Sequence, residues 1–234
     1  MSFTNDDAVA LRARLRTLAD EPYRKFHSGL LPGVENVLGV RMPRLRALAR
    51  ELSRADWEGF LACTGDEDTH EETMLRALVI ARVALPFEEH CALVRQFLPS
   101  ITDWALCDAF CADLKFLREQ PADGFDFLCS FLQSARDYDL RFAVVGLLDH
   151  FTDEEHIDRL MACYGAVRHS DYYVKMAVAW AISASCVDFA PQVFALLESD
   201  TLDDFTRRKA VSKICDSLRV SEPDKKKARA LRRV

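Results

Sequence analysis

Trp104 and Asp108 lie four residues apart in the segment 101–117, a spacing that predicts one shared helix face. An exposed indole attracts cations and stacks on planar rings. A carboxylate one turn away can stabilise positive charge or position a water molecule. Together the two side chains would suit a cationic, aromatic ligand. The alternative is structural, with Trp104 in the core and Asp108 paired with Arg141 or Lys115.

A cation recurs at the matching position of five similar segments, at steps of 30 to 34 residues. One cation per segment can hold the phosphates of a nucleic acid backbone, and each neutralised phosphate adds a salt-dependent increment to binding. Alternatively, each cation pairs with a nearby acid. Arg141 has two such acids, Asp137 and Asp139, and Lys175 has Asp171. The matching positions are Arg46, Arg76, Asp108, Arg141, Lys175 and Arg208, and Asp108 is the only acid among them.

The repeated segments predict an all-α fold, a HEAT-like (ARM-like) superhelix of stacked helix pairs. Periods in this range are typical of helical repeats, because one helix pair cannot bury its own apolar face. The β-branched run 142–148 is interpreted as helical because it lies inside a long window without turn signals. We expect one domain over 1–234, with the second helix of each pair lining a concave groove. Its parts are N-terminal helices in 1–54, helix pairs in 55–220 and a basic C-terminal helix in 221–234.

Proline and N-cap residues predict where the first helix of each pair begins. The segment Thr152–Glu155 also fits a capping box, in which the Thr and Glu side chains bond each other's backbone N–H groups. The expected starts are near Asp56, Pro86, Pro121, Thr152, Pro191 and Pro223.

Charge is strongly segregated along the chain, although the net charge is only −6. Residues 1–54 carry 10 Lys and Arg against 6 Asp and Glu, whereas residues 55–206 carry 10 against 28. Residues 207–234 carry 11 against 3. Basic ends around an acidic middle could bind a polyanion at two places. Alternatively, the basic residues Lys225–Lys227 and Arg232–Arg233 belong to a solvated terminal helix.

Metal, membrane and secretion signals are not apparent in the sequence. The eight cysteines include no CxxC pair, and we expect reduced, mostly buried thiols with no metal or other cofactor. No run approaches the roughly 18 apolar residues of a membrane span, and the N-terminus lacks a signal-peptide pattern. We therefore expect a cytoplasmic monomer.

Four segments resemble the DNA alkylation repair family, the AlkD-like HEAT-repeat proteins. They are LGVRMPRLRALAREL, TDWALCDAF, DYDLRFAVV and DYYVKMAVAWAIS, within a likeness that covers about residues 23–219. The resemblance implies a DNA glycosylase of base excision repair that removes cationic N3- or N7-alkylated purines from double-stranded DNA without a metal.

Functional roles for individual residues follow from the same resemblance. Trp104 and Asp108 match the family's Trp-x-x-x-Asp pair, and Arg141 matches its groove arginine. Asp108 would stabilise the oxocarbenium-like sugar and position water, Trp104 would contact the sugar or base, and Arg141 would hold a phosphate. The expected DNA-binding residues are Arg46, Arg76, Lys175, Arg208, Tyr172 and Tyr173. Which of Tyr172 and Tyr173, and which of Tyr23 and Phe26, faces the groove stays open.

A second function remains open beside the enzyme. The same groove could belong to a non-catalytic repeat scaffold that binds DNA structure or a protein partner. The acidic middle favours the scaffold, whereas the presence of Trp104, Asp108 and Arg141 together favours the glycosylase.

Overall fold

The computed structural model describes residues 2–63 and 68–231, and in these residues it contains helices and no strand. The all-α prediction is therefore confirmed. The chain forms two compact units, residues 1–116 and 117–234. The predictions of one repeat domain, a HEAT-like superhelix and a concave groove stay predictions.

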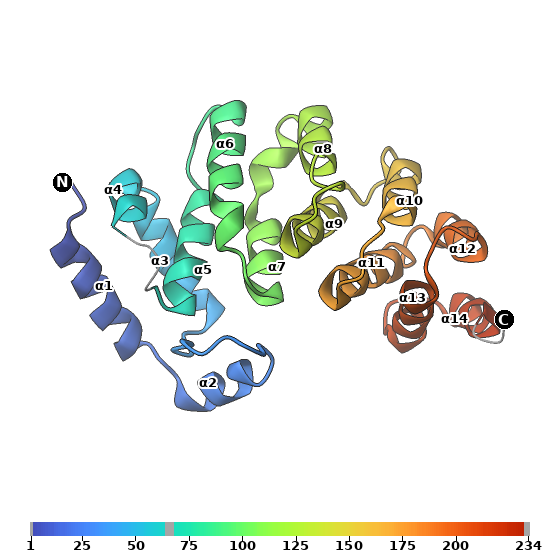
Figure 1. Ribbon diagram of the computed structural model, residues 1–234, viewed down its shortest axis with the longest axis horizontal. Coiled ribbons are helices and arrows are strands. Elements are labelled where there is room, and N and C mark those ends of the chain that lie inside the picture. The colour runs from blue at the N-terminus through green and yellow to red at the C-terminus, as the bar shows by residue number, and fades with distance from the viewer. Residues whose placement is uncertain (1, 64–67, 232–234) are drawn as a thin grey trace. The chain divides into compact units, whose positions relative to one another are not determined.

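The first unit contains seven α-helices among its described residues. Helices α3, α5 and α7 pack in succession, and α6 packs on α5 (Figure 1). The core is formed by apolar side chains that are buried on these helices, such as Leu48, Leu75 and Phe110. The helices are α1 (Asn5–Thr17), α2 (Glu21–Ser28), α3 (Met42–Leu52), α4 (Trp57–Ala62), α5 (His70–Ile80), α6 (Phe87–Phe97) and α7 (Trp104–Asp113), with the 3-10 helix η1 (Leu98–Ser100). A second 3-10 helix, η2 (Lys115–Arg118), contains the residues at which the first unit ends and the second begins.

The second unit has two layers. Helices α9, α11 and α13 pack in succession in one layer, and α10, α12 and α14 do so in the other, while α8 packs on α9. Phe142, Val144 and Val145 are fully buried inside α9, so the β-branched run is helical as predicted. The helices are α8 (Pro121–Cys129), α9 (Asp137–Phe151), α10 (Ile157–Ala166), α11 (Tyr172–Ser185), α12 (Ala190–Glu198), α13 (Asp204–Asp216) and α14 (Glu222–Leu231).

Most of the predicted helix starts are confirmed to within about two residues. Asp56 is the N-cap of α4 and accepts the Gly59 N–H at 3.1 Å, and Pro86 is the N-cap of α6. The start predicted at Thr152 is wrong. Thr152 is the C-cap of α9, and its hydroxyl donates backwards to the Leu148 carbonyl at 2.7 Å, so α10 begins only at Ile157. A Thr hydroxyl can accept a backbone N–H of the helix that follows it or donate to a backbone carbonyl of the helix that precedes it. Thr152 does the second.

Candidate functional site

Trp104 and Asp108 both lie on α7, and both are partly exposed. Trp104 is the first residue of the helix, and its indole Nε1 donates to the carbonyl of Leu30 at 3.0 Å. This bond fixes the ring while the side chain remains accessible. The interpretation of Trp104 as a buried core residue is therefore not supported.

A buried ion pair supports the start of α7. Asp103 caps the helix by accepting the Leu106 N–H at 2.9 Å, and its second carboxylate oxygen lies 3.2 Å from Nε2 of His70 on α5. Burial opposes the charged imidazolium, but the interaction with Asp103 outweighs it, so the pKa of His70 is raised. Burial likewise opposes the Asp103 carboxylate, yet His70 and the backbone N–H groups lower its pKa. The pair therefore favours the charged form of both partners.

Sequence reasoning did not single out this pair. An Asp immediately before a helix is a capping signal, and it precedes Trp104 directly. His70 gave no comparable signal, because its contact with Asp103 depends on how α5 packs against α7.

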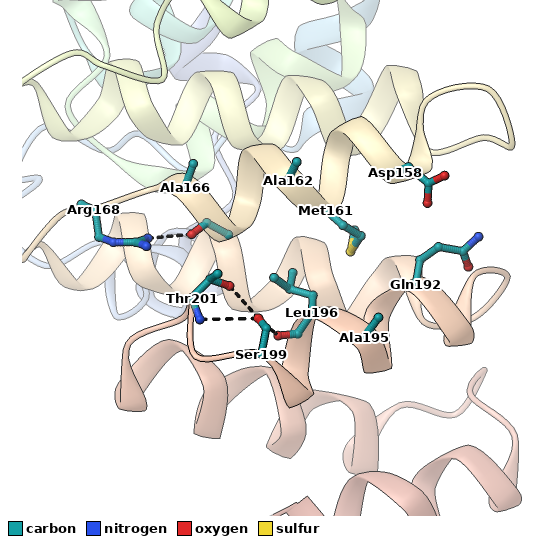
Figure 2. A pocket seen from close by; sticks show the side chains of 11 residues that line it. Asp158, Met161, Ala162, Ala166, Arg168, Gln192, Ala195, Leu196, Ser199 and Thr201 are labelled. Atoms are coloured by element: carbon teal, nitrogen blue, oxygen red, sulfur yellow. Dashed lines mark hydrogen bonds between the residues drawn. The ribbon is translucent and has the colours of Figure 1, made fainter.

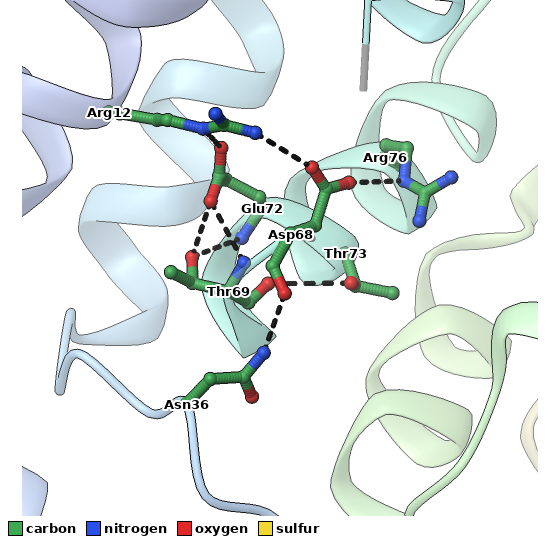
Figure 3. Close-up of polar contacts among 7 residues, drawn as sticks. All are labelled: Arg12, Asn36, Asp68, Thr69, Glu72, Thr73 and Arg76. Atoms are coloured by element: carbon green, nitrogen blue, oxygen red, sulfur yellow. Dashed lines mark hydrogen bonds and ion pairs between the residues drawn. The ribbon is translucent and has the colours of Figure 1, made fainter. Parts of the chain in front are cut away.

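Arg76, expected to contact DNA, has its charge balanced inside the protein. Its Nε lies 3.1 Å from the carboxylate of Asp68, whose other oxygen lies 3.4 Å from Arg12. Figure 3 shows Asp68 between the two guanidinium groups. Arg12 also reaches Glu72 at 2.5 Å. Asp68, Arg76 and the His70–Asp103 pair line a polar cavity of about 430 Å³.

Arg46 shares its acidic partner with a second arginine. Its Nε lies 3.2 Å from Oδ2 of Asp113, and the same oxygen lies 2.9 Å from Arg82. One carboxylate between two guanidinium groups leaves a net positive charge beside the end of α7. That charge is suited to attracting an anion such as a phosphate.

In the second unit Arg141 is buried on α9, and its Nη1 donates to the carbonyl of Tyr173 at 2.8 Å. Tyr173 stacks on Tyr138, with ring centroids 6.5 Å apart, whereas Tyr172 is 53% exposed. Of the two tyrosines on α11, Tyr172 is thus the more accessible to a ligand.

Lys175 and Arg208 differ in how their charges are compensated. Lys175 lies 3.4 Å from Asp203 rather than pairing with Asp171, the alternative partner raised from the sequence. Asp171 caps α11 instead, accepting two backbone N–H groups. Arg208 on α13 is exposed and makes no ion pair with any residue that the structure describes.

Tyr23 and Phe26 occupy different environments on α2. The Tyr23 ring stacks on His27 at 5.2 Å and lies under the Arg41 guanidinium at 4.8 Å. Phe26 is 64% exposed. Phe26 is therefore the more accessible of the two to a ligand.

A separate cavity of about 600 Å³ lies between α10 and α12 and contains none of the predicted site residues (Figure 2). Its lining is mainly apolar and includes Met161 and Leu196. At one end the Arg168 guanidinium donates to the Gly165 carbonyl at 2.7 Å.

In a comparison with known families, residues 11–214 match the family described as DNA alkylation repair enzyme. The chain belongs to this family. A comparison with curated proteins found no match.

Family membership confirms the resemblance found in the sequence. Membership supports a role of the chain in DNA alkylation repair, with DNA as its substrate. No helix in the described part of the chain is long and apolar enough to cross a membrane.

Proposed function

We propose that this chain is a DNA N-glycosylase that excises cationic N3- or N7-alkylated purines by hydrolysis without a metal. The observation that carries the proposal is the partly exposed Trp104–Asp108 pair, one turn apart on a helix whose start is held by buried contacts. Catalytic groups need such fixed support, because a small misplacement costs much of the rate.

The chemistry needs no general acid. When the bond between C1′ of the sugar and the purine nitrogen breaks, its electron pair neutralises the positive charge on the base. The sugar becomes oxocarbenium-like, and the Asp108 carboxylate stabilises it electrostatically. Asp108 also positions the water that adds to C1′. This water loses one proton to the surrounding solvent as its bond to C1′ forms, and the sugar is left as an abasic site. The Trp104 ring face contacts the sugar or the cationic base.

The remaining predicted residues are proposed to contact the DNA backbone. Arg141 is proposed to contact a phosphate, although its side chain is buried and bonded to the Tyr173 carbonyl, so this contact requires the guanidinium to become accessible to the DNA. Arg208 and Arg46 are the best suited among the other cations, because Arg208 is exposed and Arg46 shares one carboxylate with Arg82. Arg76 and Lys175 would have to exchange an acidic partner for phosphate. Tyr172 and Tyr173 complete the proposed contacts.

The decisive experiment is release of 7-methylguanine and 3-methyladenine from methylated duplex DNA. We expect Asp108→Asn to lower the rate about 100- to 1,000-fold, the usual effect of removing one stabilising group. The control is Asp123→Asn, because Asp123 is also acidic but is exposed on α8. Release at the same rate from wild type and Asp108→Asn would refute the role of Asp108.

The second candidate is a non-catalytic scaffold. It is favoured by the acidic partners that already neutralise Arg76 and Lys175. Duplex binding without base release would support a DNA-binding scaffold. If the protein neither binds duplex DNA nor releases a base, that result would favour a scaffold that binds a protein partner.

A further inference from the structure

Two cysteines that are far apart in the sequence have adjacent side chains in the second unit. Cys129 is the last residue of α8, and Cys163 lies in α10. Their Sγ atoms are 3.9 Å apart, both side chains are partly buried, and both thiols are free. A disulfide bond is about 2.05 Å long, so side-chain rotations that shorten this separation by about 2 Å would join them.

The two thiols are chemically unequal. The hydrogen bond from Cys129 stabilises the Cys163 thiolate, and Arg159 on the preceding turn of α10 adds positive charge, which together lower the pKa of Cys163 to about 7. The same interaction raises the pKa of Cys129. Arg159 is held in place by Asp126 at 3.1 Å and by the Phe125 ring at 4.1 Å. One thiol is therefore a nucleophile near neutral pH, and its neighbour keeps its proton.

We propose that Cys129 and Cys163 form a reactive dithiol that low-molecular-weight disulfides, such as glutathione disulfide, convert to an intramolecular disulfide. The Cys163 thiolate attacks one sulfur of glutathione disulfide and expels one glutathione thiolate. Cys129 then loses its proton and attacks Sγ of Cys163, which expels the second glutathione. Two protein thiols are oxidised to one disulfide, and the oxidant is reduced to two glutathione molecules.

The new bond would join the end of α8 to α10. It would span 34 residues and enclose the whole of α9 (Asp137–Phe151), which packs on both helices. A cross-link over a loop of this length stabilises a protein mainly by restricting its unfolded chain. Oxidation should therefore raise the melting temperature of the second unit by several degrees.

The test is treatment of the full chain with glutathione disulfide, followed by intact mass measurement and peptide mapping. Wild type should lose the mass of two hydrogen atoms, retain no glutathione and yield a Cys129–Cys163 cross-linked peptide that a reducing agent removes. Cys129→Ser should retain one glutathione on Cys163, because the resolving thiol is missing. Cys163→Ser should form no internal disulfide.

Cys215→Ser is the matched control, because Cys215 is also partly buried but lies elsewhere in the unit, with Sγ 4.0 Å from the Lys225 carbonyl. It should form the same cross-link as wild type. The proposal is overturned if wild type keeps a stable glutathione adduct on Cys163. It is also overturned if Cys163 in the wild-type protein is alkylated no faster than Cys215 and no cross-link forms. The wild-type measurements do not depend on whether either serine variant folds.

Discussion

Glu71 should be one of the most important stabilising side chains in the first unit. It lies on α5 and is 1% exposed. Its Oε2 accepts the N–H of Leu38 at 2.8 Å, and its Oε1 accepts those of Gly39 at 2.6 Å and Val40 at 3.1 Å. One carboxylate therefore satisfies three consecutive backbone donors that precede α3.

These three residues in turn support α2. The Gly39 carbonyl accepts the N–H of Asp20, the N-cap of α2, at 3.0 Å. Gly39 has a φ of +86°, and a Cβ on it would meet Arg24 at 2.6 Å, so another residue would not fit there. Loosening the Leu38–Val40 segment should therefore also loosen the helix that carries Tyr23 and Phe26.

Glu71→Gln removes one acceptor and turns an amide N–H₂ group toward a backbone donor. A hydrogen bond to a charged group contributes about 1.5–3 kcal/mol, and a buried donor without a partner costs about 1–3 kcal/mol. Because these terms overlap, we expect the free energy of unfolding of the first unit to fall by about 2–4 kcal/mol. Glu35→Gln is the control, because Glu35 is exposed in the same loop, and its effect should stay within about 0.5 kcal/mol.

Urea unfolding measures the loss of free energy, and amide hydrogen exchange locates it. The amides of Leu38, Gly39 and Val40 should exchange at least about tenfold faster in Glu71→Gln, because their closed state is destabilised by more than 1.4 kcal/mol. A loss below about 1 kcal/mol with these amides still protected would refute the reasoning.

Three further predictions concern charged residues of the same chain. The raised pKa of His70 means that its charge stabilises the fold below about pH 6.5, the unfolded value, and that this contribution is lost as pH rises through the folded pKa. In melting-temperature scans His70→Gln should remove this pH dependence, and an unchanged profile would contradict it. Arg208→Ala should reduce the slope of log affinity against log salt concentration by about 0.9 in duplex binding, with an unchanged melting temperature. An unaltered slope would exclude a phosphate contact. Arg76→Ala should lower the free energy of unfolding by about 1–3 kcal/mol in urea titrations, because it leaves a buried carboxylate with one cation fewer, and a loss under 0.5 kcal/mol would contradict this.

Helical periodicity was the most reliable signal in the sequence. It identified α9 as a helix despite its β-branched residues, because fifteen residues without a turn signal are too many for an ordinary strand. Local capping signals were less reliable. Thr152 was predicted to begin a helix, whereas its hydroxyl bonds the carbonyl of Leu148 in the helix that it ends. The two uses of a Thr side chain look the same in a sequence.

What the sequence alone determined is what depends on neighbours along one helix. The four-residue spacing of Trp104 and Asp108 places them one turn apart on α7, and the similar segments and their family could be identified from the residues themselves. Tertiary structure decided which charges are compensated and which side chains meet. Lys175 pairs with Asp203, the N-cap residue of α13, and Cys129 contacts Cys163, which lies 34 residues further along the chain. Such contacts depend on how helices distant in sequence pack together, and a residue's own segment carries no record of that packing.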